Sequence, residues 1–174
     1  MKYYIGIDPA FRKNGFACAV IDLDRKTISY HQFKGGFLEF SHWLMYKAPE
    51  RNKTLVCVEN SNLQNTSFDV RGNVYQVARK SRDVGKNQAI SQNVFDLCFM
   101  MGYATINLSP LKKGSKWNHQ TLVAVLDKEG IQTGKTNQDK RDAAKLALIA
   151  MKKPYLAKQK KPVSYTHLTL PTKD

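Results

Sequence analysis

The fold prediction starts from one short stretch, Lys2-Tyr-Tyr-Ile-Gly-Ile-Asp8, which is followed by Pro9. Aromatic and β-branched residues dominate it, a pattern typical of a buried strand, and it ends in a carboxylate. Segments 15–22 and 27–33 have a similar character and follow after short polar connections. Connections this short predict an antiparallel meander of three strands.

The remaining chain predicts two further strands, each reached through a helix. Residues 54–59 form a continuous apolar run that ends at Glu59, and residues 104–108 form the last strand. The spacing of apolar residues predicts helices starting near residue 37 and covering 74–101, 117–128 and 139–152. We therefore expect an α/β fold with a mixed five-stranded sheet. Its first three strands are antiparallel, its first, fourth and fifth strands are parallel, and helices cover both faces.

The charge composition indicates which class of partner the protein binds. The 174 residues include 28 Lys and Arg against 14 Asp and Glu, a formal net charge of +14, so a polyanion such as nucleic acid or an anionic membrane surface is expected. No apolar run approaches the roughly 18 residues of a membrane span and no signal peptide precedes Ile5, which indicates a cytoplasmic protein. Three scattered cysteines without a C-x-x-C pair indicate buried thiols rather than a disulfide framework or zinc site.

Four acidic residues stand where solvation does not explain them. Asp8 and Glu59 each end an apolar strand, and Asp139 and Asp142 lie one turn apart on one helix face. Taken singly, Asp8 could form a turn, Glu59 could cap the next segment, and the helix pair could serve the helix dipole. Taken together in a basic chain, they favour a pair of divalent cations held by oxygen ligands, as metal-assisted phosphodiester cleavage requires.

These residues carry a resemblance to a known family. The segments Ile5-Gly-Ile-Asp-Pro9, Gly15-Phe-Ala-Cys-Ala-Val20, Val58-Glu59 and Asp139-Lys-Arg-Asp142-Ala-Ala-Lys-Leu-Ala147 resemble the RuvC family of Holliday junction resolvases, most of all its phage-type members. The segment 83–92 is similar to that family's long-helix pattern. The likeness spans roughly residues 3 to 151 of the chain.

The resemblance implies an RNase H-like fold, a homodimer, and paired nicks in branched DNA such as four-way junctions. It further implies dependence on Mg²⁺ or Mn²⁺, with two ions per site and no small-molecule cofactor. Asp8, Glu59, Asp139 and Asp142 take the places of the family's four acidic ligands. A phage-encoded protein acting in a bacterial host is the expected setting.

Several basic or aromatic residues are candidate DNA contacts. Lys112, Lys113 and Lys116 cluster after the fifth strand, where they would grip phosphates or stabilise developing charge, unless they form an ordinary solvated loop. Arg79, Arg82 and Lys86 follow the long helix as a basic stripe that could equally be solvated. Bacterial family members place an aromatic wedge three residues after the acidic strand end, where this chain has Asn62. Phe68, the nearest aromatic, is the candidate in its place.

The chain divides into an expected nuclease domain, residues 1–157, and a segment at 158–174 that we interpret as a basic tail joined to a non-native, adapter-derived stretch. A genuine flexible tail is the alternative. Two other functions stay open: an RNase H-like nuclease that cuts flaps or RNA/DNA hybrids, and a non-catalytic basic DNA-binding protein on the same fold. The four carboxylates are the feature that argues against loss of catalysis.

Overall fold

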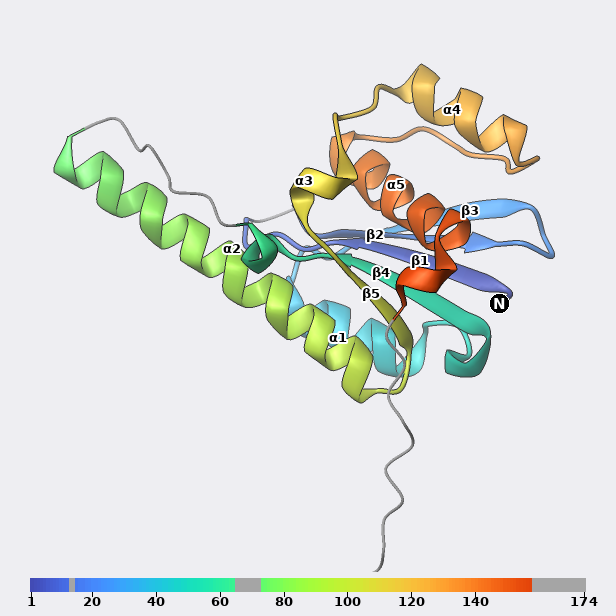
Figure 1. The fold of residues 1–174 in the computed structure, drawn as a ribbon, viewed down its shortest axis with the longest axis horizontal. Helices are drawn as coiled ribbons and strands as arrows, with labels where there is room; N and C mark the ends of the chain where they lie inside the picture. The colour runs from blue at the N-terminus through green and yellow to red at the C-terminus, as the bar shows by residue number, and fades with distance from the viewer. Residues whose placement is uncertain (13–14, 65–72, 158–174) are drawn as a thin grey trace, which may run out of the picture.

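A computed structural model describes residues 1–12, 15–64 and 73–157. Phe68 and the proposed tail lie outside this part of the chain. Five strands form one sheet in the order β3-β2-β1-β4-β5 (Figure 1). Their bounds are β1 Tyr3–Asp8, β2 Ala17–Asp22, β3 Thr27–Gln32, β4 Thr54–Glu59 and β5 Ala104–Leu108.

The pairing of the strands confirms the predicted mixed sheet. β1 pairs antiparallel with β2, and β2 pairs antiparallel with β3. On its other side β1 pairs in parallel with β4, and β4 pairs in parallel with β5. β1 is therefore the central strand, and the carboxyl ends of β1, β4 and β5 meet at one edge of the sheet.

Helices cover both faces of the sheet, as predicted (Figure 1). One core packs the sheet against α4 and α5, and the other packs it against α1 and α2. The helices are α1 Phe37–Tyr46, α2 Val74–Met100, α3 Pro110–Lys113, α4 His119–Lys128 and α5 Gln138–Lys152, with single 3₁₀ turns η1 Arg51–Lys53, η2 Ser61–Leu63 and η3 Pro154–Leu156. The sequence patterns did not predict α3, whose four residues are too few to establish a helical period.

The long helix α2 has two unlike halves. Its second half packs on the sheet through buried Val94 and Cys98, with Ile90 and Leu97 partly buried beside them. Its first half extends beyond the sheet (Figure 1), and Val74 and Tyr75 at its start are 80% and 86% exposed. None of the helices in the described ranges is both long and apolar enough to cross a membrane.

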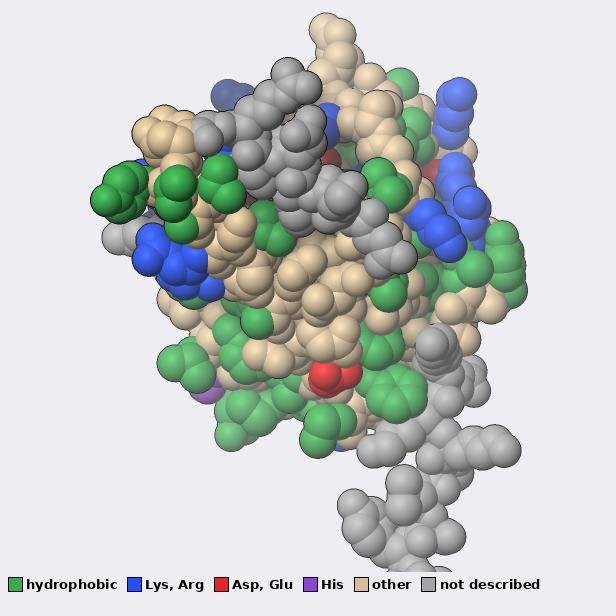
Figure 2. All heavy atoms as spheres, turned by 60° about the vertical axis from the view of Figure 1, so that its left-hand side comes forward, with side chains coloured by type: hydrophobic (Ala, Val, Ile, Leu, Met, Phe, Trp, Pro, Cys, Tyr) green, Lys and Arg blue, Asp and Glu red, His purple; other side chains and the backbone are tan. Residues whose placement is uncertain are grey.

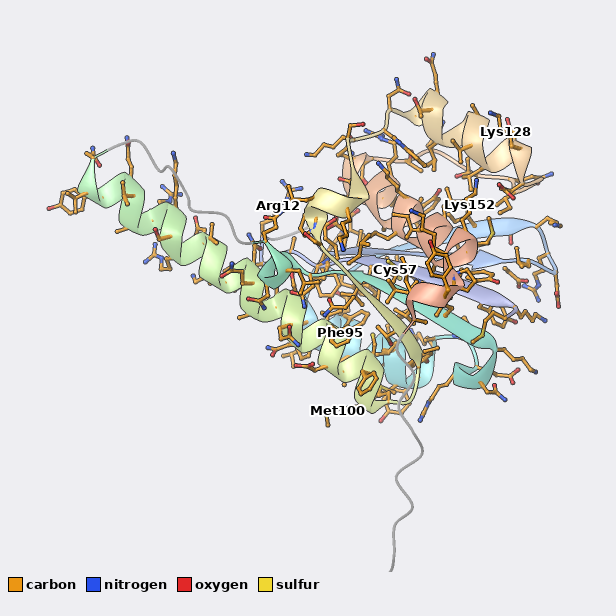
Figure 3. The ribbon with its side chains drawn as sticks, viewed as in Figure 1. Arg12, Cys57, Phe95, Met100, Lys128 and Lys152 are labelled. Atoms are coloured by element: carbon orange, nitrogen blue, oxygen red, sulfur yellow. The ribbon has the colours of Figure 1, made fainter. Side chains whose placement is uncertain are left out.

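The cysteines match their expected setting. Cys18, Cys57 and Cys98 are all free thiols buried in the two cores. Cys57 lies within the central part of the sheet (Figure 3). They serve packing, as small apolar residues do.

Candidate active site

The sheet itself brings two of the four carboxylates together. Ile7 of β1 lies opposite Val58 of β4 in the parallel pair, so the following residues, Asp8 and Glu59, lie at neighbouring strand ends. Both strands are apolar up to that point, and their burial fixes where the carboxylates leave the sheet. The sequence prediction of adjacent acidic strand ends agrees with this geometry.

Helix α5 brings the other two carboxylates to the same edge. It crosses β1 so closely that a Cβ on Gly6 would overlap the carbonyl oxygen of Ala143 and the amide nitrogen of Ala147. Only glycine allows this approach, because any side chain would meet the helix backbone. The approach places the Asp142 side chain, 7% exposed, over the end of β1, with Asp139 one turn earlier.

All four carboxylates line one cavity of about 450 Å³ at this edge of the sheet. Backbone and side chains of the β1–β2 loop, η2, α2 and α3 complete its wall. The lining consists of Asp8, Pro9, Ala10, Arg12, Gly15, Glu59, Ser61, Gln64, Asn87, Ser91, Pro110, Lys113, Lys116, Asp139 and Asp142. The cavity thus combines four acidic and three basic side chains in one polar space.

Lys113 is the cation at the centre of this cavity. Its ammonium forms an ion pair with Glu59 Oε2 and lies 4.0 Å from Asp142 Oδ1, and its side chain is only 10% exposed. Burial lowers the pKa of Lys113, but the charges of Asp8, Glu59 and Asp142 outweigh burial and raise it above its ordinary value. Lys113 is therefore a buried partner of the carboxylates, whereas the sequence predicted it as a contact to phosphate and not as an ion-pair partner of Glu59.

Asp8 is the carboxylate with the least compensation. No described residue donates a hydrogen bond to it, while Asp142 accepts one from Gln138 Nε2 at 3.0 Å. Burial raises the pKa of Asp8 to about 7, and the negative charges of Glu59, Asp142 and Asp139 add to that effect against the opposing charge of Lys113. An ionised carboxylate in such surroundings is stabilised when a cation binds it, because the cation offsets both desolvation and repulsion by the neighbouring negative charges.

Arg12 is a site residue that the sequence reasoning missed. Its guanidinium Nη2 lies 2.5 Å from Asp139 Oδ1, and it comes from the loop after β1 (Figure 3). The same loop is held on α2, because the Phe11 amide donates to Asn87 Oδ1 at 2.9 Å and Lys86 Nζ lies 4.5 Å from the Phe11 ring centre. A basic residue four positions after a strand-end aspartate was the available signal.

The donor set fits hard divalent cations in its chemistry. Carboxylate oxygens are the ligands that Mg²⁺ and Mn²⁺ take in proteins. Within the described ranges no three acidic, histidine or cysteine side chains converge tightly enough to hold one ion by themselves. Lys113 and Arg12 instead balance Glu59, Asp142 and Asp139. Lys113 also attracts Asp8, but Asp8 forms no ion pair of its own among the described residues, so its negative charge is the least compensated in this cavity.

The other candidate DNA contacts are spread around the site. Lys112 and Lys116 are exposed, and Lys116 also lines the acidic cavity. Arg79 and Arg82 are exposed on the projecting half of α2. On the face drawn in Figure 2, Lys and Arg side chains gather toward the edges and acidic side chains are sparse. Among the predicted DNA contacts, Lys113 and Lys116 line the cavity, whereas Arg79 and Arg82 lie on a separate part of the surface.

Comparison with known proteins gives a fold but no family assignment. No protein-family model matches the sequence, and no curated protein matches it. The structure is similar to that of Thermus thermophilus RuvC in complex with Holliday junction substrate, with 16% sequence identity, a TM-score of 0.53, and coverage of 92% of this chain and 100% of that chain. A second Thermus thermophilus RuvC structure gives 13% identity, a TM-score of 0.50, and coverage of 91% and 99%. The chain thus has the RNase H-like fold of RuvC.

Proposed function

We propose that this protein is a structure-selective DNA endonuclease that hydrolyses phosphodiester bonds in four-way or similarly branched DNA with the help of Mg²⁺ or Mn²⁺. One observation carries the proposal: four carboxylates from β1, β4 and α5 line a single cavity in a chain of net charge +14. The RuvC neighbour bound to a Holliday junction supports the choice of substrate. The phage-type assignment rests on the sequence motifs alone and is part of the proposal.

The chemistry divides between the carboxylates and the basic residues. Two divalent ions held by Asp8, Glu59, Asp139 and Asp142 would supply Lewis-acid activation of water and of the phosphoryl group. The carboxylates themselves would orient these ions, since their positions are fixed by the strand ends of β1 and β4 and by α5. This division of labour makes the carboxylates necessary for cleavage and dispensable for DNA binding.

The cations of the cavity have their own role. The ammonium of Lys113 and the guanidinium of Arg12 lie in the same cavity as the carboxylates. Beside a substrate phosphate they would be fixed positive groups that stabilise charge developing on its oxygens. Exposed Lys112 and Lys116 at the rim would hold the flanking backbone.

We also propose that the active unit is a symmetric homodimer. Resolution of a junction needs two opposed strands cut nearly together, and a two-fold dimer supplies two matching sites. The projecting half of α2 is the surface offered for this contact, since its side chains are largely exposed and a Cβ added at Gly85 would meet no heavy atom within 4 Å. Sedimentation with junction DNA is expected to give about twice 19.8 kDa for the protein part.

The deciding experiment compares a labelled four-way junction with linear duplex, flap and RNA/DNA hybrid substrates, with and without Mg²⁺. Wild-type protein should nick the junction symmetrically and only with the ion. Glu59→Gln should abolish nicking and retain junction binding. Glu50→Gln is the matched control, because Glu50 precedes the opposite end of β4 and is 62% exposed. Undiminished nicking by Glu59→Gln would overturn the proposal. Faster cleavage of the flap or the RNA/DNA hybrid than of the junction would change the substrate assignment to that structure.

A further inference from the structure

A second cavity, of about 590 Å³, lies beside the acidic one, between β5, α3, α4, α5 and η3. We call it the lysine pocket. Apolar side chains form its floor, and lysines surround it. Its lining consists of Leu108, Lys112, Lys113, Trp117, Val125, Lys145, Leu148, Ile149, Lys152, Lys153 and Leu156. A cavity of this size and character is typical of a small-ligand or nucleotide subsite.

Lys145 is the buried lysine of this pocket that lacks a carboxylate partner among the described residues, whereas Lys113 pairs with Glu59 and Lys152 with Glu129. The residue is only 8% exposed, and no described carboxylate forms an ion pair with it. Its ammonium donates to the Ser115 carbonyl at 2.6 Å and lies 4.7 Å from the centre of the Trp117 ring. Burial and the nearby charge of Lys113 lower the pKa of Lys145, and the attraction of Asp142 offsets only part of that effect. A buried ammonium without a counter-ion is costly, so an anion in the pocket would stabilise it.

Lys113 joins the lysine pocket to the acidic cavity. Its side chain lines both, and its ammonium is the one paired with Glu59. The two cavities are therefore neighbours, and a DNA strand whose phosphate reaches the carboxylates would pass beside the lysine pocket. The pocket offers a nucleotide of that strand an apolar wall for the base and lysines for the phosphate. Paired bases in a duplex are stacked and cannot enter such a pocket, whereas unpaired bases can.

We propose that the lysine pocket binds an unpaired nucleotide of the substrate strand next to the phosphate held at the carboxylates. The base lies against the apolar wall formed by Leu108, Leu148 and Trp117, and the adjoining phosphate is the counter-ion of Lys145. This inference rests on the proposed nuclease function and deepens it, because it gives a physical basis for choosing DNA with unpaired nucleotides at a branch point. We take the occupant to be DNA for two reasons. The lysines around the pocket favour a polyanion, and Lys113 also lines the acidic cavity in which the DNA strand would be cut.

The fluorescence of Trp117 reports directly on the lysine pocket. The chain has two tryptophans, and Trp43 lies buried in the aromatic cluster on the opposite face of the sheet. Trp43→Phe therefore leaves Trp117 as the single reporter. In metal-free buffer, an oligothymidylate should quench Trp117, and an abasic oligonucleotide of equal length should quench it several-fold less. Equal quenching by both would overturn the proposal, because the backbone alone would then account for binding.

Two variants with matched controls test the site itself. Leu156 is 41% exposed at the pocket wall, and Leu38 is 78% exposed on α1. Leu156→Asp should weaken oligothymidylate binding about tenfold, and Leu38→Asp should not. Lys145→Met should lower the slope of log affinity against log salt by about 0.7, as loss of one single-strand phosphate contact does. Lys128→Met, at the exposed end of α4 (Figure 3), should leave that slope nearly unchanged.

The outcomes separate this inference from the proposed function. If wild-type protein nicks junctions while Leu156→Asp binds oligothymidylate as wild type does, the nucleotide subsite is wrong and the nuclease assignment stands. If Leu156→Asp and Lys145→Met lose affinity while junctions are never nicked, the subsite stands without the nuclease. Quenching of Trp117 by an acidic peptide and not by DNA would overturn the subsite in favour of a protein partner.

Discussion

Helices α5 and α2 differ in almost every respect that bears on function. α5 has 15 residues, of which eight are buried, including the charged Asp142 and Lys145. α2 has 27 residues, of which only Ser91, Val94 and Cys98 are buried. The shorter helix is thus embedded in the protein on most of its surface, and the longer one is attached by one end.

This difference indicates which function the charged residues of each helix can serve. On α5, backbone contact with β1 at Gly6 fixes the position of Asp139 and Asp142 relative to Asp8. On α2, exposed charges such as Arg79 and Asp83 keep their water and their side-chain freedom. Fixed, partly desolvated groups suit metal binding and catalysis, and solvated ones suit contact with a long polyanion or a partner chain.

The largest expected effect contrasts an acid on each helix. Asp142→Asn should reduce the nicking rate about a thousandfold, because in the proposed mechanism several kcal/mol of transition-state stabilisation by bound ions would depend on a correctly placed carboxylate. Asp83→Asn, on the exposed half of α2, should leave the rate within about twofold. Single-turnover cleavage of a labelled junction measures both. Similar losses in the two variants would show that α5 holds no special position.

The second effect concerns the close contact that positions α5. Gly6→Ala should destabilise the fold by about 3 kcal/mol, since the new Cβ meets backbone atoms of α5 and cannot be accommodated by side-chain rotation. Gly134→Ala is the control, because Gly134 precedes α5 and has no heavy atom within 4 Å of the added Cβ. Urea denaturation of both variants gives the free energies of unfolding. An unaffected Gly6→Ala protein would mean that α5 lies farther from β1.

A third effect follows from the burial of Asp8 and from the carboxylates of β4 and α5 around it. In the folded protein the pKa of Asp8 is raised to about 7 from its ordinary 3.8, so the protonated form is favoured by folding. Its contribution to stability is complete below about pH 3.8 and is lost as the pH rises through 7. In metal-free buffer, Asp8→Asn should therefore melt a few degrees above wild type at pH 8.

Near pH 4 the two proteins should melt at similar temperatures. Thermal unfolding with a chelator across this pH range measures the difference. Added Mg²⁺ should raise the melting temperature of wild type at pH 8 and have little effect on Asp8→Asn. A difference between the variants that is constant with pH would contradict the raised pKa.

The smallest effect lies on α2. Gly85 is inside a helix and has open space around it, so Gly85→Ala should stabilise the monomer by about 1 kcal/mol through helix propensity. The measurement is thermal unfolding at a protein concentration where sedimentation gives the monomer mass. A lower melting temperature under those conditions would show that this part of α2 packs against another segment of its own chain.

Much of the fold followed from local patterns. The meander, the two crossover strands and the four longer helices were predictable because each has an apolar period and a turn or cap at its ends. Asn137, for example, accepts a hydrogen bond from the Lys140 amide and so begins α5 next to the predicted residue. Adjacency of Asp8 and Glu59 also followed, because parallel neighbouring strands end at the same edge.

Local sequence patterns were enough to predict the strand order, the presence of helices on both faces of the sheet, and the acidic residues that end apolar strands. Tertiary structure decided that Lys113 pairs with Glu59, that Arg12 pairs with Asp139, and that Lys145 is buried beside Trp117. Hydrophobic periodicity is local, so a sequence reveals it. Contacts between side chains far apart in the sequence depend on how separate elements pack, and here the packing of α3 and α5 against the sheet settles them.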